Sequence, residues 1–148
     1  MYSTPIYPDV LAAFDSWSSA SASTSRKEIA IYSSGSIFAQ KLLFQHIKDP
    51  AIPDDPEAVL DRRGIIKDWF DTTNAGLKHE TGSYEKIAVA LGQDPLNVLF
   101  LSDSVKEVRA ALGASMKAVV VDRPGNPPLS EEDRQDLDII ESLEHLEL

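Results

Sequence analysis

Cysteine is absent from the 148-residue sequence, which excludes a disulfide framework and a zinc site built on thiolates. No apolar run approaches the ~18 residues that a membrane-spanning helix needs. Residues 1–8 contain neither the basic cluster nor the apolar segment of a signal peptide. We therefore expect a soluble, cytoplasmic protein with no membrane partner.

Positive charge is also scarce. The sequence has 14 Lys and Arg against 24 Asp and Glu, which gives a formal net charge of −10 at pH 7. Nucleic acids select proteins with basic patches, and Lys and Arg are not gathered into a cluster in this chain. We therefore expect no nucleic-acid partner. The 43% of hydrophobic residues can form a real core, and the length suits one domain.

Hydrophobic patterning predicts strands that alternate with helices. Apolar runs predict four strands, at 29–33, 69–72, 97–102 and 117–121, and the run 97–102 suits a strand buried on both faces. Helical spacing predicts helices at 9–17, 37–46, 83–91 and 105–112, another that begins at 130–133, and a short strand or helix at 142–148. The Ser/Ala/Thr tract 18–25 predicts a flexible loop. This alternation is typical of an α/β protein with a parallel sheet.

Ligands of open parallel sheets bind at the carboxyl ends of the strands, so the residues there are the candidates for chemistry. The first predicted strand ends in Ser33-Ser34-Gly35, just before a helix. Hydroxyl groups and free backbone N–H groups at such a place can bind an anion. Taken alone, the same three residues also suit an ordinary loop.

The third predicted strand ends at Asp103, and Glu107 follows one helical turn later. Two carboxylates at the end of a strand suit a hard cation such as Mg²⁺, which takes a few protein oxygens together with phosphate and water. The alternative is that Asp103 simply caps the N-terminus of the helix 105–112. Taken alone, the pair favours the cap.

Lys78 lies in Gly76-Leu77-Lys78, after the second strand, and nothing local separates it from Lys67 or Lys86. The order along the chain is more informative, because a hydroxyl turn, a lysine and an acidic strand end each follow a strand. Together they supply contacts to phosphate oxygens, a cation for developing negative charge and a metal ligand. Those are the groups that phosphoryl transfer requires.

Several stretches resemble the enolase-phosphatases, also called acireductone synthases, of the haloacid dehalogenase superfamily. The chain is similar to that family's second motif, lysine motif, metal motif and following strand and turn, and to the stretch leading out of its cap domain. The matching stretches are Ile31–Ser36 with Ala39–Phe44, Phe70–Lys78 with Glu80–Tyr84, Val98–Glu107, Val119–Asn126 and Tyr7–Trp17. The resemblance covers nearly the whole chain.

The resemblance implies a Rossmann-like parallel sheet of the haloacid dehalogenase type and a Mg²⁺-dependent phosphatase. The implied reaction converts 2,3-diketo-5-methylthiopentyl-1-phosphate to an acireductone and phosphate in methionine salvage. Ser33, Ser34 and Lys78 would bind the phosphorylated substrate, Asp103 would hold Mg²⁺, and Glu107 would have a supporting role at most. The resemblance further implies a monomer in the cytoplasm, and in the nucleus as well if the source is eukaryotic.

Two departures from the family qualify this expectation. The family's nucleophile motif, Asp-x-(Asp or Glu)-Gly-Thr at the end of an apolar strand, does not occur in the sequence. We therefore expect a partial core domain over residues 1–148, without the nucleophile strand or the cap domain, and assign no catalytic nucleophile. Without that strand, the strands ending at Ser33 and Asp103 lose a partner. The second departure is the Pro/Asp-rich segment 47–68, which we interpret as a surface insertion.

Two hypotheses follow. In the first, the sequence is part of a phosphatase of this family and is close to inactive alone. In the second, it is a non-catalytic remnant that binds phosphate or a partner protein.

Overall fold

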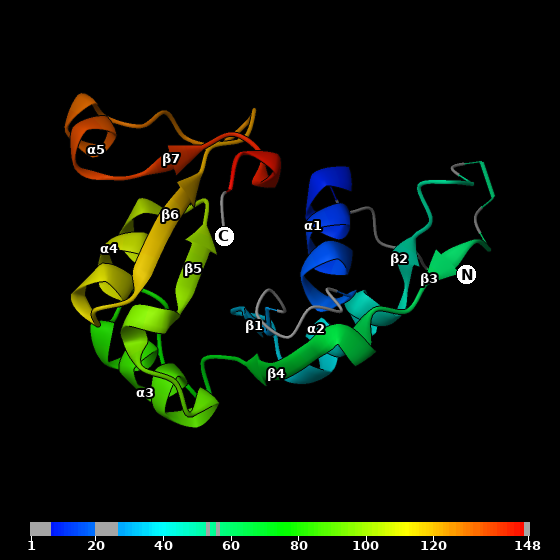
Figure 1. Ribbon diagram of the computed structural model, residues 1–148, viewed down its shortest axis with the longest axis horizontal. Helices are drawn as coiled ribbons and strands as arrows, with labels where there is room; N and C mark the ends of the chain where they lie inside the picture. The colour runs from blue at the N-terminus through cyan, green and yellow to red at the C-terminus, as the bar shows by residue number, and fades with distance from the viewer. Residues whose placement is uncertain (1–6, 20–26, 53, 56, 147–148) are drawn as a thin grey trace. The chain divides into compact units, whose positions relative to one another are not determined.

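The computed structural model describes residues 7–19, 27–52, 54–55 and 57–146. The chain, expected as one partial core domain, divides into two compact units, residues 1–71 and 72–148 (Figure 1). Parallel pairing of strands separated by helices confirms the mixed α/β class. Across the described residues no helix is long and apolar enough to cross a bilayer.

The described residues of the first unit form two helices and four strands. In chain order these are α1 (Pro8–Ser19), β1 (Ile29–Tyr32), α2 (Ile37–Gln45), β2 (Ile47–Lys48), β3 (Val59–Leu60), the 3₁₀ turn η1 (Arg63–Ile65) and β4 (Ile66–Phe70). Strands β1 and β4 pair in parallel, and β2 and β3 form a short antiparallel ladder.

The core of the first unit is built around Phe44 of α2. Its ring stacks on Phe14 of α1 at a centroid distance of 6.3 Å and meets Trp69 edge-on at 5.5 Å. The buried residues of this core are Leu11, Ile29, Phe44, Ile47 and Ile66. Aromatic pairs of this kind add stability beyond the area that they bury. The core therefore fixes α2, and with it the turn between β1 and α2.

Two predicted boundaries in this unit are wrong. Helix α1 continues through Ser19, and Ser18 Oγ in its last turn donates to the Phe14 carbonyl at 2.8 Å. The loop predicted for 18–25 therefore begins too early, and its residues from 20 onward lie outside the described part of the chain. Strand β4 runs from Ile66 to Phe70, three residues earlier than predicted, because Ile66 pairs with Ile29 of β1.

The segment 47–68 is a surface segment only in its middle. Ile47 is fully buried and Ile66 is 7% exposed, and both belong to the core of the first unit. The described residues between 50 and 57 are all exposed. The predicted insertion was therefore drawn too wide, because apolar residues at both ends are used by β2 and β4.

The described residues of the second unit, 72–146, form three helices and a parallel three-stranded sheet. In chain order these elements are α3 (Thr81–Leu91), η2 (Pro95–Asn97), β5 (Leu99–Ser102), α4 (Val105–Gly113), β6 (Lys117–Val121), α5 (Glu131–Asp136), β7 (Ile139–Ile140) and η3 (Leu143–His145). The strand order is β5-β6-β7. Gly92, with φ 66°, ends α3 in the left-handed conformation that glycine allows. Ser130 and Asp133 form a capping box at α5.

Strand β5 differs from its prediction in burial. All four of its residues are half-buried, whereas its apolar run suggested a strand covered on both faces. Within the described residues β5 is an end strand that pairs only with β6, and β1 pairs only with β4. Each parallel sheet therefore has an edge at β1 or β5 with no second strand in the described part of the chain.

Candidate active site

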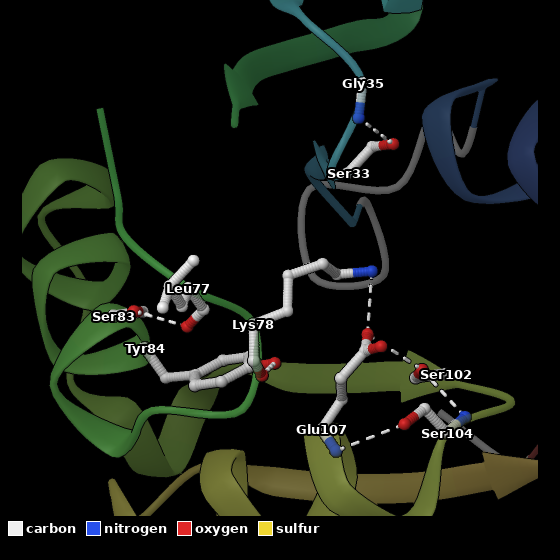
Figure 2. A network of polar contacts seen from close by, with 9 residues as sticks. All are labelled: Ser33, Gly35, Leu77, Lys78, Ser83, Tyr84, Ser102, Ser104 and Glu107. Carbon is white, nitrogen blue, oxygen red and sulfur yellow. Dashed lines mark hydrogen bonds and ion pairs between the residues drawn. The ribbon is translucent and has the colours of Figure 1, made fainter. Parts of the chain in front are cut away.

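The turn between β1 and α2, residues 33–36, is here called the serine turn. Ser33 Oγ accepts a hydrogen bond from the Gly35 N–H at 3.1 Å (Figure 2). Ser36 Oγ accepts one from the Ala39 N–H at 3.1 Å and caps α2. The Ser33 N–H donates to the Phe70 carbonyl at 3.1 Å, which ties the turn to the end of β4.

The serine turn presents hydrogen-bond donors. The oxygen of Ser33 acts as an acceptor toward Gly35, so its own O–H can donate outward. Ser34 is exposed, and neither its hydroxyl nor its N–H has a partner within the described residues. Donors of this kind before a helix N-terminus favour an anion with several oxygens, such as a phosphoryl group.

Lys78 lies in the turn between β4 and α3, and helix α3 holds this turn. Tyr84 donates its O–H to the Lys78 carbonyl, and Ser83 Oγ donates to the Leu77 carbonyl at 2.7 Å. Tyr84 is itself fully buried, with its ring 4.9 Å from that of Phe100. The backbone of Lys78 is therefore anchored to the core of the second unit.

The side chain of Lys78 forms an ion pair with Glu107 of α4. The distance from Lys78 Nζ to Glu107 Oε1 is 2.7 Å, and the two side chains are 25% and 18% exposed (Figure 2). Ser102 Oγ, at the end of β5, donates to the same carboxylate oxygen at 3.2 Å and accepts from the Ser104 N–H at 3.1 Å. Glu107 therefore orients the ammonium group of Lys78 next to the carboxyl end of β5.

Asp103 does not cap α4. The cap is Ser104, whose Oγ accepts from the Glu107 N–H at 3.5 Å, so the alternative interpretation of Asp103 is wrong. Sequence alone could not separate the two, because serine and aspartate cap helices about equally well. Asp103 is exposed directly after β5, and within the described residues its carboxylate has no hydrogen bond or ion pair.

The donor set suits a hard cation that keeps several waters. Asp103 offers carboxylate oxygens, whereas the carboxylate of Glu107 is engaged with Lys78. In the described part of the chain no three His, Cys, Asp or Glu side chains gather into a metal-binding group. A single exposed carboxylate is compatible with Mg²⁺, which binds through one or two carboxylates, water and substrate phosphate. Mg²⁺ binding at Asp103 stays a prediction.

The predicted site residues divide between the two units. Ser33 and Ser34 belong to the first, and Lys78, Asp103 and Glu107 to the second. The structure brings Lys78 and Glu107 together, and Asp103 follows Ser102, which also binds Glu107. That all five residues serve one site stays a prediction.

Sequence reasoning missed the residues that support these groups. Ser102 lies in a predicted strand but had no predicted role, and no role was predicted for the buried residues Gln40 and Asp71. A polar residue within an apolar helical stretch, as at Gln40, was the available signal. The partners of these side chains come from separate elements, which local spacing does not reveal.

Known proteins resemble the chain over almost its whole length, although no family model matches it. The enolase-phosphatase E1 of Pyricularia oryzae is 49% identical over 146 residues, which is 96% of this chain and 56% of that protein. That of Candida dubliniensis is 39% identical over 150 residues, 97% of this chain and 55% of that protein. Over almost its whole length the chain is therefore homologous to part of the enolase-phosphatases. It spans about half the length of the curated relatives that it matches.

Solved structures agree with this assignment. The UTR4 protein of Saccharomyces cerevisiae matches 98% of this chain and 58% of its own, with a TM-score of 0.83 and 34% identity. A haloacid dehalogenase family enzyme of Bacteroides thetaiotaomicron, solved with magnesium and inorganic phosphate, has a TM-score of 0.60 at 11% identity and shows the fold alone. The chain therefore shares the fold of these solved proteins, one of which is a haloacid dehalogenase family enzyme.

Proposed function

We propose that this chain supplies the phosphoryl-binding, lysine and metal-binding parts of a Mg²⁺-dependent enolase-phosphatase. The reaction would convert 2,3-diketo-5-methylthiopentyl-1-phosphate to an acireductone and phosphate, in the cytoplasm, as a step of methionine salvage. The observation that carries the proposal is the half-buried Lys78–Glu107 ion pair next to the strand end that leads into Asp103. The names of the relatives support it.

Each residue would have a separate role. Ser33 and Ser34 would donate hydrogen bonds to the phosphoryl oxygens, and Lys78 would balance the charge that develops on them. Asp103 would hold Mg²⁺, partly through water, and the bound ion would supply Lewis-acid stabilisation of that charge. Glu107 would keep the Lys78 ammonium group directed at the substrate.

These residues position and stabilise, but they do not attack phosphorus. Phosphoryl transfer needs a nucleophile in line with the scissile bond, and the Asp-x-(Asp or Glu)-Gly-Thr motif is not in the sequence. The missing motif also favours the second candidate, a chain that binds phosphate or a partner protein without catalysis. The two candidates differ in whether the Lys78 and Asp103 positions support turnover once a nucleophile is supplied.

The test joins the chain, in cis, to the remaining half of the Pyricularia oryzae relative and measures Mg²⁺-dependent phosphate release. We expect turnover, and we expect Lys78→Met and Asp103→Asn each to lower kcat by about 10²–10³, as the loss of one electrostatic group does in other enzymes. Lys86→Met is the matched control, because Lys86 is exposed on α3 and forms no ion pair within the described residues. A folded chimera without turnover would favour the non-catalytic candidate.

A further inference from the structure

A buried glutamine connects the serine turn to strand β4. Gln40 of α2 is 5% exposed, and its Nε2 group donates to the Gly35 carbonyl at 2.9 Å and to the Phe70 carbonyl at 2.8 Å. Both hydrogens of the amide are therefore used. The Phe70 carbonyl also accepts from the Ser33 N–H. Strand β4 is therefore connected to Ser33 directly and to Gly35 through Gln40.

The orientation of the Gln40 amide is determined by these partners. Rotating the group by half a turn would place Oε1 against two carbonyl oxygens, which have no hydrogen to donate. In the orientation present, Oε1 is buried and has no hydrogen-bond partner within the described residues. A buried acceptor without a partner carries a desolvation cost, which an apolar side chain of the same length would avoid.

A neighbouring carboxylate reinforces the same turn. Asp71, which is 9% exposed, follows β4 and accepts a hydrogen bond from the Ile37 N–H at 3.3 Å through Oδ2. The end of β4 thus holds the first residue of α2 as well as Gly35. Ser34, between these anchors, is the residue whose donors have no partner within the described residues.

We propose that Gln40 is a positioning residue that holds the serine turn in the shape that receives a phosphoryl group, at a cost to the stability of the fold. This inference rests on the phosphoryl role proposed above for Ser33 and Ser34. Gln40 touches no substrate and acts through the Gly35 carbonyl and the end of β4. Fixing the turn before binding removes ordering entropy that the ligand would otherwise have to overcome.

The experiment compares the ¹⁵N-labelled 148-residue chain with Gln40→Met and with the control Gln45→Met. Methionine keeps the length of glutamine and removes both donors and the unsatisfied acceptor. Gln45 is the last residue of the same helix, is half-buried, and has no side-chain hydrogen bond within the described residues. Four quantities are measured: Tm, the amide exchange rates and the order parameters of the serine turn without ligand, and the Kd for inorganic phosphate from the Ser34 amide shift.

For Gln40→Met we expect about tenfold faster exchange at the Ser33 amide, lower order parameters at Ser34 and Gly35, and about tenfold weaker phosphate binding. Its Tm should be unchanged or higher, and Gln45→Met should change none of these quantities. A turn that stays ordered in Gln40→Met, or one that loosens only together with a fall in Tm, would overturn the inference. If the original chain binds no phosphate while Gln40→Met loosens the turn at undiminished Tm, the phosphoryl proposal fails and the positioning role stands.

Discussion

Lys78 illustrates how a single residue gains a role from a partner that is distant in sequence. Its local sequence did not distinguish it from Lys67 or Lys86, and only the order of groups along the chain and the family resemblance selected it. The structure adds Glu107, whose carboxylate is held by Ser102 as well. That contact joins a turn to a different helix, so no spacing rule within either element predicts it.

The ion pair between Lys78 and Glu107 should be stronger than an exposed pair, because both side chains are largely removed from solvent. A double-mutant cycle with Lys78→Met and Glu107→Gln should give a coupling free energy of about 1 kcal/mol in urea unfolding. The matched control is Lys67–Glu28, with the same 2.7 Å distance but side chains 40% and 56% exposed, for which we expect about 0.3 kcal/mol. Equal coupling free energies in the two cycles would mean that burial does not strengthen the Lys78–Glu107 ion pair.

At the scale of elements, regular patterns were predictable and short or distant pairings were not. Six elements lie close to their predicted ranges: the strands β1, β5 and β6 and the helices α2, α3 and α4. Each has an apolar run or a helical period long enough to be recognised in the sequence. The two-residue strands β2, β3 and β7 carry no period and depend on pairing with distant segments. Ser104 rather than Asp103 caps α4, which the sequence could not decide because both types of residue cap helices well.

The turn that carries Lys78 requires glycine at position 76. Gly76 has φ 113°, and a Cβ there would lie 2.6 Å from Ser83 Oγ, which holds the Leu77 carbonyl. Gly76→Ala should therefore lower the free energy of unfolding by about 2 kcal/mol, from backbone strain and a disturbed hydrogen bond. Gly82→Ala is the control, since nothing lies within 4 Å of its added Cβ, and helix propensity should raise stability by about 0.5 kcal/mol. Similar values for the two variants in chemical denaturation would refute this account of the turn.

Helices α4 and α5 are joined by a charged contact that gives a pH-dependent prediction. The hydrogen bond from Arg109 at 2.8 Å, followed by that from Ser130, lowers the pKa of Asp133 below its ordinary value of 3.8. Because the folded-state pKa is depressed, the contact stabilises the fold above pH 3.8, and this contribution is lost as the pH falls through the lower value.

In Arg109→Met the pKa of Asp133 should rise toward 3.8, as measured by ¹³C NMR titration of its carboxyl group. Lys106→Met, an exposed residue of the same helix, is the control and should leave the titration of Asp133 unchanged. An Asp133 midpoint that does not move in Arg109→Met would show that Arg109 is not the main cause of the shift.

At the scale of the whole molecule, the central fact is that the chain matches about half of its relatives' length. Composition predicted the size of the core, and the resemblance predicted the fold and the candidate site. The division into two compact units was not predicted, because pairing between strands depends on segments far apart in sequence. Strands β1 and β5 each have one strand partner in the described residues, so the serine turn and Asp103 both follow end strands of their sheets.

The most direct test of the account is a steady-state assay of phosphate release from the diketone phosphate by the purified 148-residue chain with Mg²⁺. We expect turnover close to background, since the sequence contains the proposed binding and charge-stabilising groups but not the nucleophile motif. A small residual rate is expected from those groups alone. Turnover in the ordinary enzyme range of about 1–10³ s⁻¹, abolished by Asp103→Asn, would contradict it and would show that this sequence contains its own nucleophile.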